Sequence, residues 1–407
     1  MNKIGLYLGI DPYAGGTFQY DQAVLEAVSA LPREEYTAVA VCASLHWTTY
    51  LNGHDVKAVF IRNGPGRRAF WKAWRGMHLP VSTGRTLCAY AEPAARALLR
   101  ERCDLWIFPS QDPMAFQAPV PALVAVHDLM HRYEPRFPEV SANGTYRKRE
   151  WGYRNMCKWA DGILVDSNMG KIHVMESYGQ SGERIHMLPY IAPKYIHSQQ
   201  TPGDFGSRYR LPEKFIFYPA HFWEHKNHRS LISAIGRLKR EIPDLKLVLV
   251  GSAQNGYHTS VKQIQSLNLS EDIVILGYVA DEDMSELYRR ARALVMPTFF
   301  GPTNIPPREA FAAGCPVAVS DIYGIPEQVG DAALLFNPAS VEEIAHCIKQ
   351  LWTDDDLCAT LVSRGRQRAA AWGQRQFNER FRDIIEHTLQ VRRASATQTK
   401  AFREDLD

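Results

Sequence analysis

The chain has 407 residues, and because a domain usually holds about 100–200 residues, this length predicts two or three domains. Hydrophobic residues make up 45% of the chain and charged residues 22%, a composition that excludes wholesale disorder. Lys and Arg number 47 against 44 Asp and Glu, which gives a formal net charge of +3. So small an excess provides no general attraction to nucleic acid, and we expect no nucleic-acid partner.

The seven cysteines are scattered and contain no CxxC pair. This spacing argues against a disulfide scaffold or a zinc ribbon and favours a reducing, cytoplasmic compartment. No apolar run approaches the roughly 18 residues of a membrane-spanning helix. The apolar start of the chain is typical of a signal peptide, but it stops at Asp11 without a small-residue cleavage site, so we interpret it as a first strand.

Short apolar runs alternate with longer amphipathic stretches along most of the chain. The runs lack period-2 alternation, which is typical of strands buried on both faces of a parallel sheet. They lie at 4–10, 37–42, 56–61, 105–108, 122–126, 163–165, 185–188, 215–218, 245–250, 273–276, 293–296, 317–319 and 333–336. The expected helices between and after them lie at 17–31, 87–101, 146–160, 227–241, 281–291, 340–352 and 354–391. Repeated strand–helix units predict a doubly wound α/β fold.

A stretch rich in proline at 189–212 interrupts this pattern and separates two α/β halves of similar size. We therefore expect an N-terminal domain at 1–195 and a C-terminal domain at 205–375. A helix at 376–392 should return to the N-terminal domain, and a polar tail should occupy 393–407. The predicted architecture is two Rossmann-like domains facing a central cleft, and the alternative is one large sheet.

Two features in the first half are candidates for ligand contact. Gly15 and Gly16 follow the first strand, where glycines let the backbone approach a ligand at a helix N-terminus. The alternative is a tight strand-to-helix turn. His127 closes a buried strand, at the edge where open α/β sheets bind ligands. It could contact substrate, be a structural histidine, or hold a metal with His131, although no third ligand is evident.

In the second half, Lys226 stands at the expected start of the helix at 227–241. An ammonium beside the positive end of a helix dipole favours an anion such as phosphate, although a solvated surface lysine is the alternative. Gly301 and Pro302 force a loop after the strand at 293–296, and two prolines then start a helix. That helix carries Glu309 in its first turn, where a carboxylate facing the cleft could accept hydrogen bonds from two ribose hydroxyls.

A series of motifs in the correct order resembles the retaining GT-B glycosyltransferases usually called family 4, which include sucrose synthase and bacterial mannosyltransferases. The motifs are the N-terminal landmarks Gly15-Gly16 and His127-Asp128, the strand at 160–167, His225-Lys226-Asn227, the loop at 300–310, and the segments 314–317 and 326–333. The likeness spans most of residues 1–385, with its strongest block at 218–338. It implies the GT-B fold, with an acceptor-side domain at 1–195 and a donor domain at 205–375, and a nucleotide diphosphate sugar as donor substrate.

The resemblance also implies roles for individual residues. Lys226 would bind the donor diphosphate and meet the charge of the departing nucleotide, and Glu309 would hold the donor ribose. His127 would lie beside the reacting sugar, and Gly15 and Gly16 would let the backbone approach the diphosphate or acceptor. Further donor contacts would come from His221 and from the backbone N–H groups of Thr303, Asn304 and Ile305.

Two positions depart from the family pattern. Gly301 stands where members carry the first Glu of an E-x7-E motif, and His221 stands where they carry an Arg. The missing Glu usually engages the transferred sugar, so sugar identity is left open. No acidic cluster suited to a divalent metal is evident, so we expect no metal and no cofactor. Lys226 and helix N-termini would then meet the leaving-group charge.

A basic and aromatic segment lies at 62–75 in the first half. Cationic side chains interleaved with interfacial aromatics favour a helix lying on an anionic membrane. The alternative is a segment whose aromatic rings pack inward. The residues concerned are Arg62, Arg67, Arg68, Phe70, Trp71, Lys72, Trp74 and Arg75.

The sequence therefore predicts a retaining, metal-independent glycosyltransferase that moves a hexose, mannose-like or related, to a glycan acceptor that can be lipid-linked. We expect it in the cytoplasm, with peripheral contact to the membrane. Two alternatives stay open. One is a nucleotide-sugar epimerase of the same fold. The other is a degenerate GT-B module that binds a glycan or a partner protein, which is suggested by Gly301.

Overall fold

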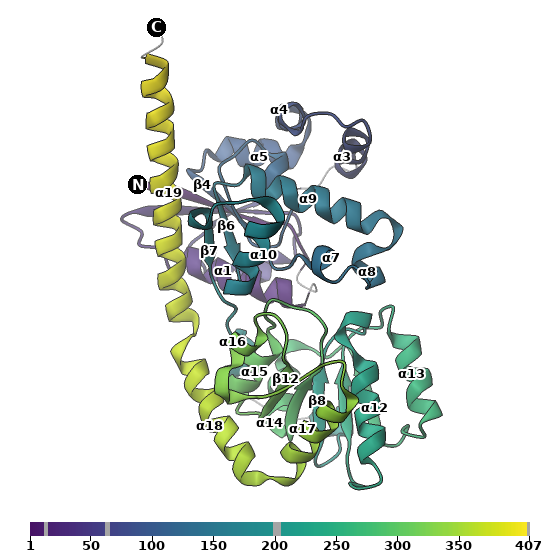
Figure 1. Cartoon of the computed structure of the whole chain (residues 1–407). Coiled ribbons are helices and arrows are strands. Elements are labelled where there is room, and N and C mark those ends of the chain that lie inside the picture. The colour runs from purple at the N-terminus through teal and green to yellow at the C-terminus, as the bar shows by residue number, and fades with distance from the viewer. Residues whose placement is uncertain (12–14, 62–65, 198–204, 405–407) are drawn as a thin grey trace. The chain divides into compact units, whose positions relative to one another are not determined.

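The computed structural model describes residues 1–11, 15–61, 66–197 and 205–404 (Figure 1). The chain divides into two compact units. Unit 1 consists of Met1–Leu129, Lys148–Pro189 and Gln374–Asp407, and unit 2 of Met130–Arg147 and Tyr190–Gly373. Part of the proline-rich stretch, 198–204, lies outside the described residues, as do Arg62 and the last three residues of the expected tail.

Unit 1 is built on a seven-stranded parallel sheet in the order β3-β2-β1-β4-β5-β6-β7. Its strands are β1 (Asn2–Leu8), β2 (Tyr36–Cys42), β3 (Lys57–Phe60), β4 (Leu105–Phe108), β5 (Ala122–Ala125), β6 (Gly162–Val165) and β7 (Ile185–Met187). Its helices are α1 (Gly16–Ser29), α2 (Trp47–Leu51), α3 (Gly66–Gly76), α4 (Val81–Ala91), α5 (Pro93–Glu101), α6 (Met114–Gln117), α9 (Thr145–Trp159), α10 (Asn168–Tyr178) and α19 (Gln374–Glu404), with a 3-10 turn η2 (Gly182–Arg184).

Unit 2 holds a six-stranded parallel sheet in the order β10-β9-β8-β11-β12-β13. Its strands are β8 (Ile216–Pro219), β9 (Leu247–Val250), β10 (Ile273–Gly277), β11 (Ala293–Met296), β12 (Val317–Ser320) and β13 (Leu334–Phe336). Its helices are α7 (Met130–Tyr133), α8 (Pro138–Ser141), α11 (Phe205–Tyr209), α12 (His228–Leu238), α13 (Tyr257–Ser266), α14 (Asp281–Arg290), α15 (Pro306–Ala313), α16 (Ile325–Val329), α17 (Val341–Thr353) and α18 (Asp355–Ala371). Short 3-10 turns are η1 (Ala142–Gly144), η3 (Lys194–His197), η4 (Glu224–Lys226) and η5 (Gly330–Ala332).

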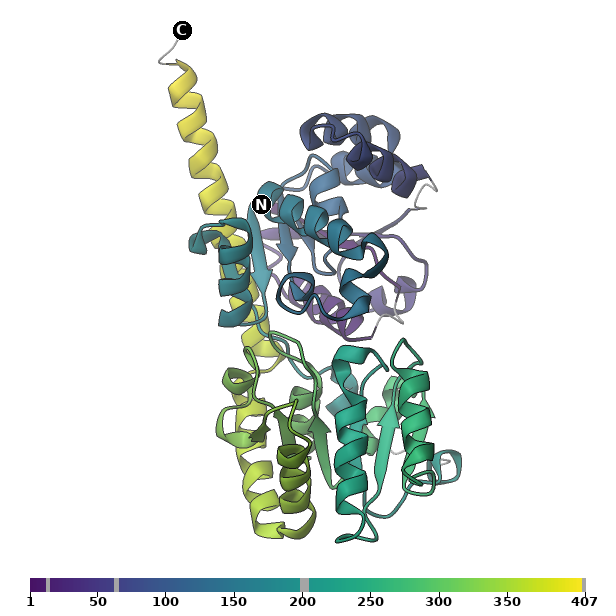
Figure 2. The same cartoon turned by 45° about the vertical axis from the view of Figure 1, so that its right-hand side comes forward.

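The strands confirm the predicted α/β class, because each predicted apolar run coincides with one strand of these two parallel sheets. The strands β4, β5, β6, β9, β11 and β12 are buried along their whole length, as continuous apolar runs require. In unit 2, α12 packs against α13 and α17, and α12 and α13 lie side by side in both views (Figures 1 and 2). The buried stripe of α12 includes Leu231, Ile235 and Leu238, a helical spacing that seats the helix on the sheet.

Two segments differ from the expected domain boundaries. Met130–Arg147 was expected in the N-terminal domain but belongs to unit 2. Its Phe137 packs in an apolar cluster with Phe300. Its Glu139 accepts hydrogen bonds from the backbone N–H and Nδ1 of His225, at 3.1 and 2.6 Å. These contacts join side chains that are distant in sequence. A domain boundary predicted from local composition cannot take such contacts into account.

The C-terminal helix is longer than expected. We predicted a helix at 376–392 and a polar tail from 393, whereas α19 is continuous from Gln374 to Glu404. It packs on α1 within unit 1, and Arg392 donates to the Asp104 carbonyl at 3.3 Å. The residues after 393 include Ala, Gln, Lys and Arg, which are good helix formers, so the polar character of this segment does not by itself end the helix.

Among the described residues, no helix combines the length and the apolar character that crossing a bilayer requires. All seven cysteines are buried free thiols.

Candidate functional site

The candidate site in unit 2 lies where the order of its sheet reverses. Strands β8 and β11 are parallel neighbours, and the chain proceeds from β8 toward one edge and from β11 toward the other. In open α/β sheets, ligands bind at the carboxyl ends of the strands beside such a switch point. The Lys226 loop follows β8, and the loop before α15 follows β11, so the topology brings both to this edge.

The backbone around Lys226 is held on both sides. Lys226 is the last residue of η4, and it lies two residues before α12 begins at His228. The Tyr218 hydroxyl donates to the Lys226 carbonyl at 2.9 Å. Asn227 adopts the left-handed conformation with φ 56°, and its Nδ2 donates to the carbonyls of Pro297 and Pro338 at 2.9 and 2.8 Å. The loop therefore offers the lysine from a fixed backbone.

The side chains of Lys226 and Asn304 meet directly. Lys226 Nζ donates to Asn304 Oδ1 at 3.2 Å. Asn304 is 8% exposed, and its Nδ2 has no hydrogen-bond partner among the residues that the structure describes. An ammonium beside an amide N–H that still lacks an acceptor forms a pair of donors, which suits an anionic ligand.

The backbone of this loop differs from expectation at Asn304. Its backbone N–H donates to Gln328 Oε1 at 3.1 Å, so it is already occupied, and the side chain is the group that meets Lys226. Ile305 is the N-cap of α15, and its carbonyl accepts from the backbone N–H groups of Arg308 and Glu309 at 2.8 and 3.2 Å. The carbonyl of Thr303 faces the backbone of Gly301 across the turn.

The turn itself accounts for the glycine at 301. Gly301 has φ 147°, a conformation that residues with a Cβ rarely adopt. A Cβ placed there would lie 2.3 Å from Asn304 Nδ2 and 2.9 Å from the Thr303 carbonyl oxygen. A glutamate at this position is therefore incompatible with the loop that seats Asn304 against Lys226.

We expect Gly301→Ala to destabilise unit 2 by about 1–3 kcal/mol, because strain of this kind adds to the clash with Asn304. The measurement is the urea midpoint of unfolding followed by circular dichroism. Gly277→Ala is the matched control, since its φ is 72° and a Cβ there meets nothing within 4 Å. Equal midpoints for the two variants would show that the Gly301 turn imposes no special constraint.

His221 lies at the position where an Arg was expected from the resemblance. Its Nδ1 accepts a hydrogen bond from the Ser252 backbone N–H at 3.0 Å, so we assign the ring proton to Nε2. Burial and the charge of Lys226 lower the pKa of His221. The His221 ring is therefore neutral near pH 7, so of these two side chains Lys226 alone carries a positive charge.

Glu309 occupies the first turn of α15 and is 5% exposed. Its Oε1 accepts from the Tyr195 hydroxyl, and its Oε2 accepts from the Tyr288 hydroxyl at 2.5 Å. Burial raises the pKa of Glu309, while the two tyrosine hydrogen bonds act in the opposite direction. The carboxylate is thus fixed in orientation by η3 on one side and α14 on the other.

The remaining predicted residues lie in unit 1. Gly15 has φ 63° and is the N-cap of α1, which Gly16 begins. His127 follows β5, its Nε2 lies 2.7 Å from the Pro109 carbonyl, and its ring meets Tyr20 edge-on at 4.9 Å. Burial lowers the pKa of His127, so the neutral ring donates its Nε2 proton to that carbonyl.

The structure thus joins Lys226 to Asn304 and places His221 within the electrostatic reach of Lys226. Glu309 stands apart with its own tyrosine partners. Neither Tyr195, which lies in the proline-rich stretch, nor Tyr288, which lies in α14, was identified from the sequence. Their spacing from Glu309, 114 and 21 residues, carries no local pattern that could have revealed the contacts.

The membrane segment is corrected in one respect. Trp71 and Trp74 were expected to face a bilayer, but they are only 4% and 8% exposed. Trp71 packs edge-on against Phe116 at 5.9 Å, and Trp74 Nε1 donates to the Pro80 carbonyl at 3.0 Å. Burial of the two indoles within unit 1 is favourable because it removes their apolar area from water and gives the Trp74 N–H a hydrogen-bond acceptor.

The chain resembles proteins of known family. Residues 204–368 match the family model described as glycosyl transferases group 1. O-antigen chain mannosyltransferase B of Escherichia coli is 33% identical over 238 residues, which are 57% of this chain and 62% of that protein. O-antigen chain mannosyltransferase RfbU of Salmonella typhimurium is 26% identical over 229 residues, or 56% of this chain and 60% of the relative. The alignments therefore span about three-fifths of each relative's length.

Solved structures support the fold. Anabaena HepE, crystallised with UDP and glucose, has a TM-score of 0.70 at 18% identity and covers 95% of this chain and 100% of its own. WaaG, a glycosyltransferase involved in lipopolysaccharide biosynthesis, has a TM-score of 0.66 at 17% identity and covers 94% and 99%. Residues 204–368 are therefore similar to the group 1 glycosyl transferases, and the chain has the two Rossmann-like units of the GT-B fold.

Proposed function

We propose that the chain is a retaining glycosyltransferase of family 4 that transfers a hexose, mannose or a related sugar, from a nucleotide diphosphate sugar to a glycan. The acceptor can be lipid-linked, and the context is the synthesis of a polysaccharide such as an O-antigen. The Lys226–Asn304 pair at the switch point carries this proposal, because it offers an ammonium and an amide donor to a leaving diphosphate. The two bacterial relatives that are named mannosyltransferases favour mannose.

The proposed chemistry assigns each residue a task. Lys226 meets the negative charge that develops as the nucleotide departs, an electrostatic contribution that is often the largest in catalysis. The Glu309 carboxylate accepts hydrogen bonds from the donor ribose. His127, Gly15 and Gly16 serve the sugar and acceptor side. Attack occurs on the same face as the departing phosphate, which acts as the base, and the anomeric configuration is retained without a metal.

A donor panel tests the function. The full chain is incubated with GDP-mannose, UDP-glucose and ADP-glucose, with a manno-oligosaccharide acceptor and with EDTA. Release of nucleotide together with an α-linked product, seen by NMR, supports retaining transfer, and persistence in EDTA supports metal independence. Interconversion of the donor sugar without acceptor would instead identify an epimerase. Binding of glycan without turnover of any donor would identify a degenerate module.

We also propose peripheral contact with anionic lipid, carried by α3 and the turn after it. Arg68 and Lys72 are exposed, and Met77 and Leu79 are 60% and 38% exposed, so cations and apolar side chains gather on one segment. In a flotation assay with vesicles of anionic phospholipid at low salt, the chain should float and Met77→Asp should reduce the floated fraction. A chain that stays wholly in the soluble fraction contradicts the proposal. The reducing cytoplasm is the proposed compartment, which fits the seven free thiols.

A further inference from the structure

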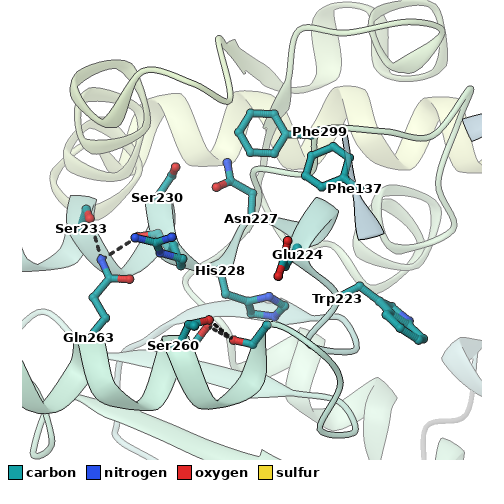
Figure 3. Close-up of a pocket in the computed structure, with 13 residues that line it drawn as sticks. Phe137, Trp223, Glu224, Asn227, His228, Ser230, Ser233, Ser260, Gln263 and Phe299 are labelled. Carbon is teal, nitrogen blue, oxygen red and sulfur yellow. Dashed lines mark hydrogen bonds between the residues drawn. The ribbon is translucent and has the colours of Figure 1, made fainter. Parts of the chain in front are cut away.

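A pocket in unit 2 lies beside the candidate site, and Asn227 borders both. Its volume is about 420 Å³, and it opens between the N-terminal ends of α12 and α13 (Figure 3). None of Lys226, His221, Asn304 or Glu309 lines it. Pockets of a few hundred cubic ångströms with scattered polar groups are typical of small-molecule sites.

Two residues that line this pocket each carry a buried acceptor atom that lacks a donor among the described residues. His228 is 3% exposed, and its Nε2 has no hydrogen-bond partner among the described residues. The His228 ring stacks on Phe222 with centroids 4.2 Å apart and bonds to the Ala220 carbonyl, so its proton is assigned to Nδ1. Burial lowers the pKa of His228 to about 3, which keeps Nε2 an acceptor.

The second acceptor is the side-chain carbonyl of Gln263. Its Nε2 donates to Ser233 Oγ at 2.8 Å and to the Arg229 carbonyl at 3.1 Å, which fixes the amide orientation. Gln263 Oε1 is buried and has no partner among the residues that the structure describes. In Figure 3 the Gln263 side chain lies at the end of the pocket away from the two phenylalanine rings.

These unmatched atoms specify the chemistry of an occupant. Both accept hydrogen bonds, so the ligand groups opposite them must donate. Phosphate and carboxylate oxygens accept and do not fit, whereas hydroxyl groups donate and accept together. The hydroxyl of Ser230 also lines the pocket and can act in either sense. The exposed Arg229 and Glu224 also line the pocket and carry opposite charges, so the polar groups together suit a ligand rich in hydroxyl groups and without net charge.

The opposite end of the pocket is aromatic. The rings of Phe137 and Phe299 lie 5.8 Å apart at 31°, and the Arg136 guanidinium packs over each ring at 4.8 and 4.7 Å. Figure 3 shows both rings on the same side of the pocket, across from the Gln263 and Ser260 end. An aromatic wall opposite hydroxyl-binding groups matches a sugar ring, which has both apolar C–H surface and hydroxyls.

We propose that this pocket binds a sugar residue of a neutral oligosaccharide, outside the transfer site. The assignment rests on the two unmatched acceptors, the serine hydroxyl and the aromatic end, and not on the catalytic proposal. That the oligosaccharide is the growing acceptor glycan is the one part that rests on the proposed function. The pocket would then hold a distal part of the glycan while another residue reacts.

The test is calorimetric titration of the full chain with a linear α-linked mannotetraose and with maltotetraose. Gln263→Leu removes one acceptor at a half-buried position, so the variant should fold. We expect its Kd for the oligosaccharide that binds to rise about tenfold, as loss of one hydrogen bond to a buried group implies. Gln265→Leu is the matched control, because Gln265 is exposed on the same helix and does not line the pocket.

Two comparisons keep this inference separate from the catalytic proposal. Lys226→Ala should slow transfer at least about 10²-fold but leave the oligosaccharide Kd unchanged, and saturating GDP should not compete. If no donor is turned over and binding still depends on Gln263, the catalytic proposal fails and the pocket assignment stands. Three results would overturn the assignment: no binding of either oligosaccharide, equal Kd values for Gln263→Leu and wild type, or displacement by GDP or inorganic phosphate.

Discussion

Lys226→Ala should fold like the wild-type chain and transfer sugar at least about 10²-fold more slowly. The rate falls because the variant lacks the ammonium that stabilises the negative charge developing on the leaving diphosphate. Lys226 is partly buried, so water replaces this interaction only in part. Folding should survive because the loop is held by Tyr218 and Asn227, not by the lysine side chain. The measurement is steady-state nucleotide release with the donor that the panel identifies, and the loss should fall on kcat.

Two further variants sharpen this prediction. Lys226→Arg keeps the charge but changes its shape, so it should recover only part of the lost rate. Lys262→Ala removes an exposed lysine from α13 and should leave the rate unchanged. A Lys226→Ala enzyme within a few-fold of the wild-type rate would refute the role of this lysine, and with it the electrostatic account of the reaction.

Glu309→Gln should weaken donor use without weakening the fold. A carboxylate that accepts hydrogen bonds from ribose hydroxyls contributes about 1.5–3 kcal/mol, so its replacement by an amide should raise KM for the donor about 10- to 100-fold. Glu282→Gln, an exposed position on α14, is the control. A KM that is unchanged in Glu309→Gln would exclude Glu309 from ribose binding.

The stability of the same variant has a predicted sign. Burial raises the pKa of Glu309, so between the unfolded and folded pKa values the native state binds more protons than the unfolded state. The Glu309 contribution to stability is therefore complete below the unfolded pKa and is lost as pH rises through the folded pKa. At pH 8, Glu309→Gln should equal or exceed wild type in urea midpoint, and its advantage should shrink toward pH 4. A midpoint well below wild type at pH 8 would contradict this.

Several features of the site follow from the sequence because their causes are local. The apolar runs predict the strands, and the last residue of a run predicts where its strand ends. Lys226 and the loop at 297–305 could therefore be placed after the carboxyl ends of their strands. Gly301 also carried a local signal, since a glycine after a strand indicates a turn. The reason for that glycine, the approach of Asn304, needed the folded loop.

The partners of the site residues were decided by tertiary structure alone. Tyr195, Tyr288 and Gln328 reach Glu309 and Asn304 from elements whose patterns describe only helices or turns. Which indoles face inward in α3 was also open, because the same spacing fits a bilayer or the Phe116 face. Hydrophobic periodicity predicts whether a side chain is buried, because the repeat of a helix or strand is a local property of the backbone. The identity of the group that covers it depends on how distant segments pack, and no local pattern encodes that.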